Sequence, residues 1–555
     1  MIEVEKILKD AENLIGKNGT WRGYQEEVAR FALPRKRWVV ATKTSGEPLD
    51  LVELYDETAE TSLRRMAGGI DYNLTNSAMK WFGLQTIDQK FMNEKSVDSW
   101  FYRFVEYLRY VLSTSNFDSV KQEYYIDKGC FGTGTIFIQE NPDGGISFKN
   151  VPIEQINPVE DINEELSHMY RVFKLSAAAA YEQWGAKAGQ EIGEKMKDKP
   201  YDEFEFIHYV GRRVKRDISS RDRFNMPYEE GIINRKERRL VFESGREEMP
   251  FVIGRFYKHA SDVFGYSPAM VAKAKTLLIN KQEQTALLRA MKEATPPMEA
   301  PMKGYSSPYD FNPHGMNFYD KLNANAGDLR PIPFNSNFSI TVEVMEKTRE
   351  AIKACFFLQE LQAITSAPRQ KTAYETQQLI AESMATLGPL ASRDLSETWR
   401  PLIVRLAKII IRQNEPYWAV GQAGSLPPPP QVLQGKAWGP VFSSPLARAL
   451  QASEVNDLVG FLQIANEIVA GQINSANSPA ADLLNFDKTI QKARELKGVD
   501  PELLNDERMV EAIRQARQKA IAAQQQQMQM AEMAKAANQG ASAYKNVKQA
   551  DQVQA

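Results

Sequence analysis

The sequence predicts a mainly helical protein that contains one α+β region, and three observations support this fold class. Apolar residues recur at three- and four-residue spacing over most of residues 1–130 and over most of the chain beyond 340. Between about 130 and 260 the apolar period shortens to two, which is typical of strands. A run without any helix breaker, 268–294, lies between a Ser-Pro step and a double proline.

The composition is that of an ordinary globular protein, and the length of 555 residues implies two or more domains. The net charge is −2, so no global basic field marks a nucleic-acid-binding protein and any such contact must be local. Cys130 and Cys355 lie far apart and are expected to be reduced thiols. Four histidines are scattered (His168, His208, His259 and His314), so no zinc or other metal site is expected.

The first part of the chain is expected to form helices over 54–84 and 98–128, followed by an antiparallel hairpin. The hairpin turn is Asn-Pro-Asp-Gly-Gly at 141–145, and the partner strand follows it. Further strands are expected within 169–175, 204–210, 238–244 and 251–259. The glycines at 129, 132 and 134 lack the Gly-Lys-Ser/Thr ending of a phosphate loop, so a turn or bulge is the better interpretation.

The helix over 268–294 has recognisable signals at both ends. Ser267 is expected to cap its first turn, and Pro268 suits the first helical position because its missing N–H has no partner there. Thr295, Pro296 and Pro297 should end it. The helix carries three more basic than acidic residues, through Lys273, Lys275, Lys281, Arg289 and Lys292 against Glu283 and Glu293.

The secondary structure of the remainder of the chain is predicted from the positions of its helix-breaking prolines and glycines. A proline-rich stretch, 296–340, should be irregular with short strands, and helix should resume over 341–362. A short loop with Arg369 and Lys371 precedes a long helical pattern, 373–413, in which a kink is expected at Leu387-Gly388-Pro389. After a polyproline linker, one extended piece and more helices from about 445, the glutamine-rich C-terminus is expected to be a solvated helix that frays.

No signal peptide and no membrane-length apolar run are found, so a soluble intracellular protein is expected. Acidic clusters such as 159–165 lack partners at metal-ligand spacing and are interpreted as solvated faces. No nucleophile, base or nucleotide loop can be argued from the residues, so no enzyme activity and no cofactor are expected.

The order of segments resembles the head-to-tail connector (portal) proteins of short-tailed, T7-like bacteriophages. The similarity is carried by 21–36, 54–84, the strand region beginning at Lys128, the Gly265-Tyr266-Ser267-Pro268 step, the helices on either side of the proline-rich stretch, and 442–451. No single motif is diagnostic, but their collinear order covers most of the chain.

The resemblance implies a portal fold that closes into a twelve-fold ring with a central channel. Its parts would be a wing (1–266 and 373–444), stem helices (267–295 and 341–362), a clip (296–340), a channel loop (363–372) and a crown (445–555). The stem would start at Gly265, Tyr266, Ser267 and Pro268, and the clip boundary would be Thr295, Pro296, Pro297 and Pro301. DNA-channel residues would be Arg369, Lys371, Lys273, Lys275, Lys281, Arg289 and Lys292.

The resemblance also implies the partners. The ring, a homo-oligomer, would sit at one capsid vertex of the virion after assembly in the host cytoplasm, among major capsid and scaffolding proteins and away from any membrane. Double-stranded DNA would pass through it without sequence specificity, and the terminase large subunit and then tail tube or adaptor proteins would dock on it. Two alternatives remain open from the residues: a phage DNA-processing nuclease, and a scaffold or minor virion protein without a channel.

Overall fold

The computed structural model describes residues 2–40, 54–88, 94–141, 145–214, 216–217, 222–260, 262–301, 310–319, 330–332, 338–365, 373–419, 424, 426–433, 435–447, 461, 463, 489–490 and 507–551. The chain divides into two units that are considered separately. The first comprises Met1–Gln85, Phe104–Pro428 and Trp438–Gln463, and the second comprises Thr86–Arg103, Pro429–Ala437 and Ile464–Ala555. The described part is mostly helical with antiparallel sheets, as the sequence predicts.

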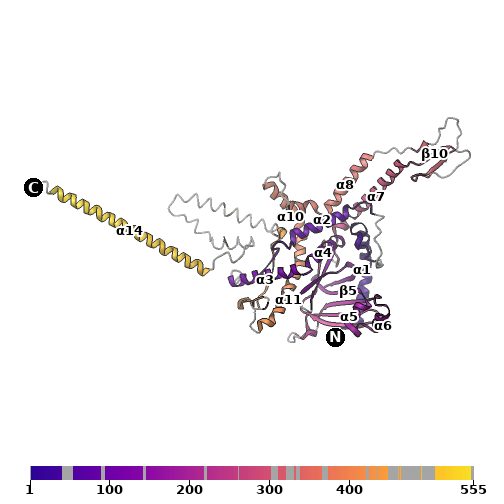
Figure 1. Cartoon of the computed structure of the whole chain (residues 1–555), viewed down its shortest axis with the longest axis horizontal. Helices are drawn as coiled ribbons and strands as arrows, with labels where there is room; N and C mark the ends of the chain where they lie inside the picture. Colours follow the sequence, from indigo (N-terminus) through magenta and orange to yellow (C-terminus); the bar gives the residue numbers. More distant parts are fainter. Residues whose placement is uncertain are drawn as a thin grey trace. The chain divides into compact units, whose positions relative to one another are not determined.

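The N-terminal region is helical, which confirms the prediction for residues 1–130 (Figure 1). Its helices are α1 (Val4–Ala32), α2 (Thr58–Leu74), α3 (Lys95–Thr114) and α4 (Phe117–Phe131), and a 3-10 turn, η1, spans Pro34–Lys36. Helix α2 packs on α4. The small residues Gly129 and Ala67 allow this close approach, because a Cβ on Gly129 would lie 2.4 Å from the Met66 side chain.

A five-stranded antiparallel sheet follows, in the order β4-β5-β6-β7-β8. Its strands are β4 (Ile156–Glu160), β5 (Leu166–Ser176), β6 (Glu203–Arg212), β7 (Tyr228–Asn234) and β8 (Arg239–Arg246). Strand β7 is not among the strands expected from the sequence. It contains Glu230, a buried carboxylate that pairs with His208 (2.9 Å) and Arg246 (2.7 Å) on the two neighbouring strands.

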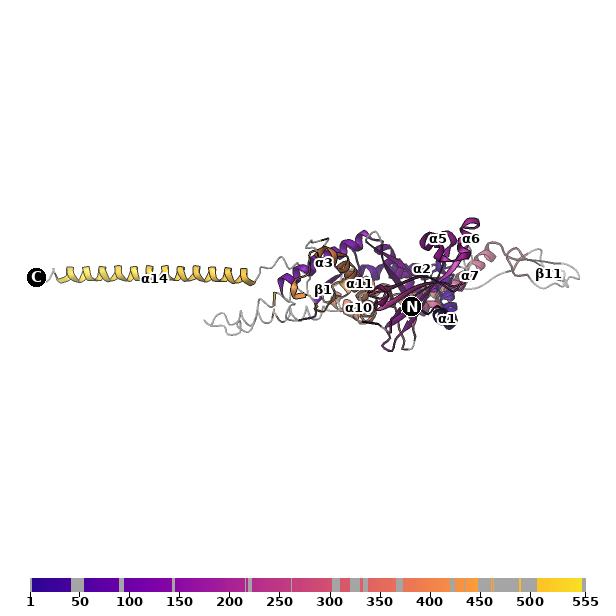
Figure 2. The same ribbon diagram turned by 90° about the horizontal axis from the view of Figure 1, so that it is seen from below.

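Helices cover both faces of this sheet, so its side chains alternate between two cores. Ile7, Leu8 and Ala11 of α1 pack on one face with Tyr170 and Tyr209. On the other face, α5 (Ala177–Trp184), η3 (Gly185–Ala188) and α6 (Gln190–Asp198) pack on Phe204, Phe206 and Val241. Figure 2 shows α5 and α6 on the side of the sheet opposite α1.

The predicted hairpin is confirmed as part of a smaller sheet, β3-β2-β9. Strand β2 (Thr133–Glu140) pairs antiparallel with β3 (Ile146–Asn150) on one side and with β9 (Phe251–Arg255) on the other. The short turns η2 (Ile153–Gln155) and η4 (Arg223–Asn225) complete this part of the chain. Gly132 caps α4 in the left-handed conformation (φ 77°) and leads into β2, which confirms the turn interpretation of the glycine-rich segment.

A long helical hairpin projects from these layers. Helix α7 (Pro268–Ala294) leads to three short strands, β10 (Met298–Pro301), β11 (Met316–Tyr319) and β12 (Arg330–Pro331), and α8 (Phe338–Cys355) returns along α7 (Figure 1). The expected loop-and-strand character of 296–340 is confirmed for its described residues.

The second helix of the hairpin differs from the predicted 341–362. It starts three residues earlier and ends at Cys355, and α9 (Leu358–Thr365) is a separate helix. The chain turns at Phe357, which has a φ of 55°, so that Phe356 is buried while the Phe357 ring stacks on Phe256 at 6.3 Å between centroids. The break therefore lies where the Phe357 backbone adopts the left-handed conformation.

The expected kink at Leu387-Gly388-Pro389 does not interrupt α10 (Ala373–Asp394), which includes Pro389. The helical geometry changes instead at a π-helical turn, η5 (Leu395–Trp399), before α11 (Arg400–Ala419). Trp399 is fully buried among Trp81, Phe117, Tyr124 and Tyr125. Asp394 and Trp399 are five positions apart. An uninterrupted α-helix would point their side chains about 140° apart, whereas the wider π turn brings both to the same core.

The last elements are the turn η6 (Gln431–Leu433), strand β13 (Trp438–Phe442) and helix α14 (Glu507–Asp551). Strand β13 pairs with β1 (Phe82–Thr86), which confirms the predicted extended piece. Helix α14 is 45 residues long and lies in the second unit. It confirms that the glutamine-rich region is helical.

Candidate functional site

The start of α7 is built as the sequence predicts. The backbone N–H of Met270 donates to Ser267 Oγ (2.9 Å), and Pro268 occupies the first helical turn. Ser267 Oγ in turn donates to the carbonyl oxygen of Cys130 (2.7 Å), and Ser267 is fully buried. One hydroxyl therefore both caps α7 and joins it to the end of α4.

Two glycines bring the backbone before α7 against the turn between α4 and β2. A Cβ on Gly132 would lie 2.0 Å from the Gly265 carbonyl oxygen, and a Cβ on Gly265 would lie 2.4 Å from the Gly132 carbonyl oxygen. The Gly265 N–H donates to Thr133 Oγ1 (2.9 Å), and Tyr257 and Tyr266 exchange backbone hydrogen bonds. Backbone contacts of this kind fix the direction in which α7 leaves the sheet.

Helix α1 supports the first turns of α7 with aromatic side chains. The Trp21 ring lies 5.0 Å from the Tyr266 ring in an edge-on arrangement. Lys273 Nζ pairs with Glu27 (2.6 Å) and lies 4.4 Å from the centroid of the Tyr24 ring. Of the predicted channel residues, Lys273 thus has its charge balanced within the subunit.

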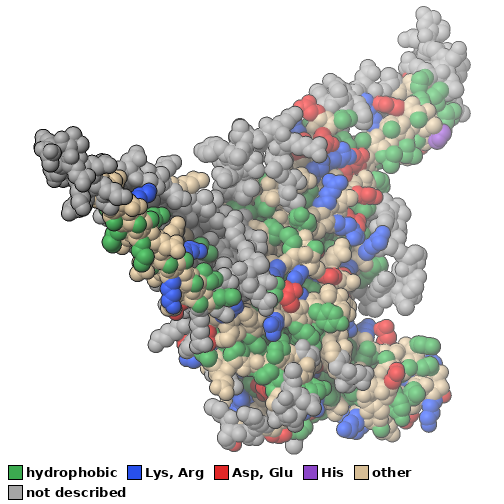
Figure 3. Space-filling model, turned by 60° about the vertical axis from the view of Figure 1, so that its left-hand side comes forward, with side chains coloured by type: hydrophobic (Ala, Val, Ile, Leu, Met, Phe, Trp, Pro, Cys, Tyr) green, Lys and Arg blue, Asp and Glu red, His purple; other side chains and the backbone are tan. Residues whose placement is uncertain are grey.

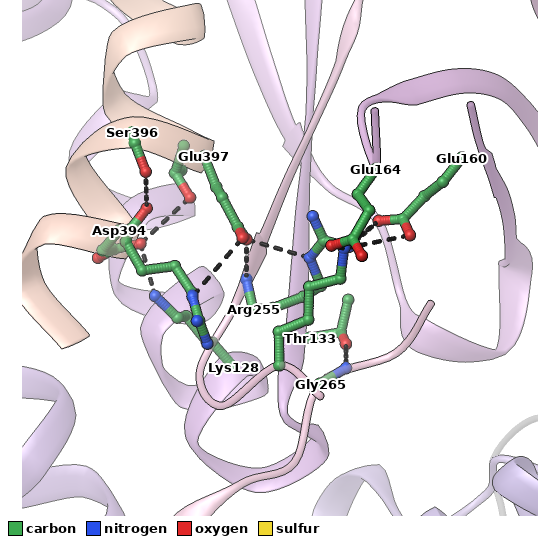
Figure 4. Close-up of polar contacts among 12 residues, drawn as sticks. Lys128, Thr133, Glu160, Glu164, Arg255, Gly265, Asp394, Ser396 and Glu397 are labelled. Atoms are coloured by element: carbon green, nitrogen blue, oxygen red, sulfur yellow. Dashed lines mark hydrogen bonds and ion pairs between the residues drawn. The ribbon is translucent and has the colours of Figure 1, made fainter. Parts of the chain in front are cut away.

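An ionic network lies beside this junction, and Figure 4 shows it. Arg255 forms ion pairs with Glu160 and with Glu397 (3.1 Å), and the Arg255 N–H also donates to Glu397. Lys258 continues the network to Glu160 (3.2 Å) and Glu164 (2.5 Å). Burial opposes the charge of Arg255, but Glu397 and Glu160 outweigh it and raise the pKa of Arg255.

A second buried charge pair ties the π turn to α4. Asp394 accepts hydrogen bonds from Lys128 Nζ (2.5 Å), Tyr124 Oη (3.0 Å), Thr398 Oγ1 (3.1 Å) and Trp399 Nε1 (3.2 Å). Burial, followed by the Asp394 charge, raises the pKa of Tyr124 well above its ordinary value. Because the carboxylate is fully hydrogen-bonded, this core holds α10 and α11 in one fixed arrangement.

The remaining predicted channel residues on α7 lie along its length. Lys275 and Lys281 are exposed, and Lys281 donates to Gln284 Oε1 (2.8 Å). Arg289 pairs with Glu293 (2.8 Å), and Lys292 is half-buried. The structure therefore does not bring the five cations to one point. Arg369 and Lys371 lie outside the described residues, as does most of the loop predicted at 363–372.

The far end of α7 stops at the predicted boundary. The Thr295 N–H and hydroxyl both donate to the Met291 carbonyl oxygen (2.9 and 2.8 Å). Pro297 is buried, and its carbonyl oxygen accepts a hydrogen bond from Ile332 (3.0 Å). Pro301 is the last residue of β10. Pro296 lies between the helix end and this strand, so the double proline separates helix from sheet.

One side of α7 is buried on the subunit and another is apolar yet exposed. Ala269, Ala272, Thr276 and Ile279 form the buried side. Val271, Leu278 and Leu288 recur at heptad-related positions on a different side and are 60, 50 and 45% exposed. Figure 3 shows apolar and basic side chains interspersed along this hairpin. This side, with Lys275 and Lys281 beside it, is called the outer face of α7.

Sequence reasoning missed the residues that hold the hairpin in place. Arg255, Glu397, Asp394 and Lys128 carry no local signal, because each lies in an ordinary helical or strand pattern and meets partners 95 to 266 positions away. The sequence did identify Gly265, Tyr266, Ser267 and Pro268, because the start of a capped helix is a local pattern.

Within the described ranges, no group of three or more His, Cys, Asp or Glu residues could hold a metal ion. Among the same residues, no helix combines the length and apolarity that crossing a membrane requires.

Comparison with known proteins gives the class of this chain. A family model described as bacteriophage head to tail connecting protein matches residues 4–504. The chain belongs to this family of phage portal, or head-tail connector, proteins, which are structural components of the virion rather than enzymes. The resemblance drawn from the sequence is thereby confirmed.

Two individual relatives are similar over nearly the whole length. The chain is 24% identical over 528 residues to the probable portal protein of Bordetella phage BPP-1, which covers 94% of this chain and 91% of that protein. It is also 24% identical over 550 residues to the portal protein of Salmonella phage epsilon15, with 97% and 95% covered.

Proposed function

We propose that copies of this chain close into a ring at one capsid vertex and that double-stranded DNA passes through the ring during packaging and ejection. In this assembly, the hairpin of α7 and α8 is the stem, and the strands β10–β12 form the clip. The layers described around the two larger sheets are the wing. The resemblance to T7-like connectors suggests twelve copies.

The outer face of α7 is the observation that carries the proposal. A subunit alone leaves Val271, Leu278 and Leu288 exposed on a helix whose other side is already packed. Burial of such side chains stabilises by about 1.5–3 kcal/mol each, so a neighbouring copy that covers them gains substantially. When a face of one copy meets a different surface of the next copy, each copy is related to the next by a rotation. A ring forms if these successive rotations add up to one full turn.

The charges beside this face suit a sliding duplex. Among the described residues, the structure gives Lys275 and Lys281 no carboxylate partner, so each copy adds free positive charge to the stem. Repeated around a ring, these charges form a belt that neutralises phosphates without reading bases. A few cations per copy attract DNA but bind it weakly enough for movement.

The clip is the proposed docking site for the terminase large subunit and, after packaging, for tail tube or adaptor proteins. Backbone hydrogen bonds hold the parts of the clip together: the Met298 N–H donates to the Gly315 carbonyl oxygen (2.9 Å), and the Ile332 N–H donates to the Pro297 carbonyl oxygen (3.0 Å). Replacing 296–340 by a short Gly/Ser linker should leave rings intact but abolish recruitment of these partners in a pull-down. Normal recruitment would remove the clip assignment.

Negative-stain electron microscopy of the purified full-length protein tests the central claim. Rings with a stain-filled hole are expected, together with a mass of many subunits by native mass spectrometry. Leu278→Glu places a charge in the outer face of α7 and should shift the population toward single subunits, whereas Ile162→Glu, at a fully exposed position between β4 and β5, is the control and should leave the rings intact. A monomer at every concentration and salt tested would overturn the proposal.

A further inference from the structure

A groove with a volume of about 570 Å³ opens between the five-stranded sheet, strand β9 and the segment that runs from η5 into α11. This volume lies within the range of pockets that bind ligands, about 300–1,000 Å³. We call it the acidic groove and define it by six of its lining residues: Glu165, Tyr228, Glu247, Val252, Val404 and Lys408. All of its lining belongs to the first unit of the chain.

One wall of the acidic groove is the ionic network of Figure 4. Arg255 contacts Glu160 and Glu397. Lys258 contacts Glu160 and Glu164. The side chains of these two cations are only 10 and 8% exposed, so they hold the wall together and do not reach further carboxylates across the groove.

Another part of the lining is built around Glu248. Arg405 and Arg412 lie 3.4 and 2.8 Å from its carboxylate, and Lys408 lies 3.9 Å from it. Arg405 also donates to the Glu248 carbonyl oxygen (2.9 Å), which holds the backbone next to Glu247. The cations on this side are therefore already engaged with a carboxylate of the same chain.

Two carboxylates of the acidic groove, Glu165 and Glu247, are exposed and have no cation partner among the described residues. Glu165 is held in the turn between β4 and β5. Its N–H donates to Asp161 Oδ1 (3.1 Å), and its carbonyl oxygen accepts from the Asp161 N–H (2.9 Å). Six glutamates but only three cations line the groove, so its field attracts positive charge.

Tyr228 adds an aromatic ring to this lining. The ring is half-buried, and within the described part of the chain its hydroxyl has no hydrogen-bond partner. Burial raises the pKa of Tyr228, Arg212 lowers it, and the nearby charges of Glu165 and Glu248 raise it further. An aromatic ring beside carboxylates suits a guanidinium group, which is attracted to the ring and donates paired hydrogen bonds to carboxylates.

Apolar side chains complete the lining. They include Val252 of β9, Val263 before α7, and Pro401 and Val404 of α11. Arginine has an apolar stem below its charged head, so it can cover such a surface while the head reaches the carboxylates. A polypeptide segment also supplies apolar neighbours for the valines, which a small free cation lacks. The phosphates of DNA would be repelled by the glutamates.

We propose that the acidic groove binds an arginine-bearing segment of a partner protein. The guanidinium lies among Glu165, Glu247 and Tyr228, and the rest of the segment covers the apolar lining. This surface is separate from the outer face of α7 and from strands β10–β12, so it is a different contact from those of the proposed ring and clip.

Peptide binding to the purified full-length protein tests the groove. The probe is the fluorescently labelled peptide Ala-Arg-Leu-Arg-Ala with blocked ends, and its counterpart has glutamine in place of both arginines. Fluorescence anisotropy should show that the arginine peptide binds about tenfold more tightly than the glutamine peptide. Equal affinities of the two peptides, or binding of neither, would overturn the proposal.

Variants locate the binding on the protein. Glu165→Gln with Glu247→Gln removes the two unpaired carboxylates and should weaken binding of the arginine peptide about tenfold. The matched control, Glu182→Gln with Glu194→Gln, makes the same charge change at exposed positions of α5 and α6 and should bind like the parent. Val404→Trp fills part of the groove without changing any charge and should also weaken binding several-fold. Parent-like binding by either groove variant, each checked for an unchanged thermal unfolding curve, contradicts the assignment.

Mass measurement with saturating peptide distinguishes a partner protein from a second copy of this chain. If an arginine of a neighbouring copy occupies the groove, the peptide should release subunits from ring-sized particles, and that result would overturn a separate partner. An unchanged mass with groove-specific binding supports it. Groove-specific binding to a protein that is a single subunit in every sample would support the groove while the proposed ring falls.

Discussion

The Nε atom of Arg349, on α8, lies 3.0 Å from Oδ2 of Asp56, a carboxylate just before α2 that is almost completely buried. The same guanidinium pairs with Glu283 on α7 and contacts Glu346 on its own helix. Burial opposes the arginine charge, but Asp56 and Glu283 raise the pKa of Arg349. One side chain therefore joins both helices of the hairpin to the helical layer of the subunit.

Loss of Arg349 should loosen the hairpin. In Arg349→Met, the Asp56 carboxylate stays buried without its cation. Removing one partner of a buried pair is strongly destabilising, but Arg349 is half-exposed, which reduces the cost to about 2–4 kcal/mol. We expect a destabilisation of about 2 kcal/mol, measured by urea unfolding of the full chain at fixed protein concentration.

The control for this change is Lys347→Met on the same helix. Among the described residues, Lys347 pairs only with Glu343 across one helical turn, and both side chains are largely exposed (71 and 68%). An exposed pair of this kind contributes a few tenths of a kcal/mol. Equal unfolding curves for the two variants would contradict the role assigned to Arg349.

The glycine contact at the base of α7 predicts a second effect. Gly265→Ala would place a methyl group 2.4 Å from the Gly132 carbonyl oxygen, which is backbone and cannot move aside. We expect a loss of several kcal/mol or no folded protein, measured by expression and thermal unfolding. Gly16→Ala, in α1 with open space around it, should be neutral or stabilising by up to about 1 kcal/mol. A stable Gly265→Ala protein would show that the two backbones do not meet.

A pH dependence follows from Glu154, in the turn η2. Burial raises the pKa of Glu154 from 4.5 to about 7. The folded protein then binds more protons than the unfolded chain between these two values, so stability falls as pH rises through this window and stays low above it. The difference corresponds to about 3 kcal/mol at 1.36 kcal/mol per pH unit.

The variant Glu154→Gln should remove this dependence. At pH 8 it is expected to be more stable than the parent protein by up to about 3 kcal/mol, and near pH 4.5 the two should be equal. Urea unfolding at a series of pH values measures the difference. Glu182→Gln, at an exposed position of α5, should leave the pH profile unchanged. A parent protein whose stability rises between pH 5 and 7 relative to Glu154→Gln would refute the assignment.

Local signals predicted local structure well. Ser267 and Pro268 located the start of α7, and Thr295 and the following prolines located its end, because caps and breakers act within one helical turn. The β2–β3 hairpin was likewise evident from its period and turn residues. The resemblance to the connector family rests on the collinear order of such segments along the chain, and this order is visible in the sequence alone.

Contacts between distant segments could not be predicted in this way. Lys128 and Asp394 are 266 positions apart, and Arg349 and Asp56 are 293 apart, so no window of sequence contains both partners. Phe357 breaks the helical pattern where its ring stacks on Phe256, and Glu230 lies in a strand between its partners His208 and Arg246 on the two neighbouring strands. In each case tertiary context overrode the local pattern.

The exposed cations of α7 give the prediction closest to function. The double variant Lys275→Glu and Lys281→Glu reverses two charges per copy beside the outer face of α7 and should repel the DNA backbone around the whole ring. Ring mass and ring appearance should be unchanged, while DNA-filled heads in a complementation assay should fall about tenfold or more.

Arg369→Glu with Lys371→Glu is expected to act in the same way if the loop 363–372 faces the channel. The matched control, Lys187→Glu with Lys197→Glu, makes the same charge change at exposed positions near α5 and α6 and should package normally. Equal packaging by the α7 variant and this control would mean that the lysines of α7 do not face DNA.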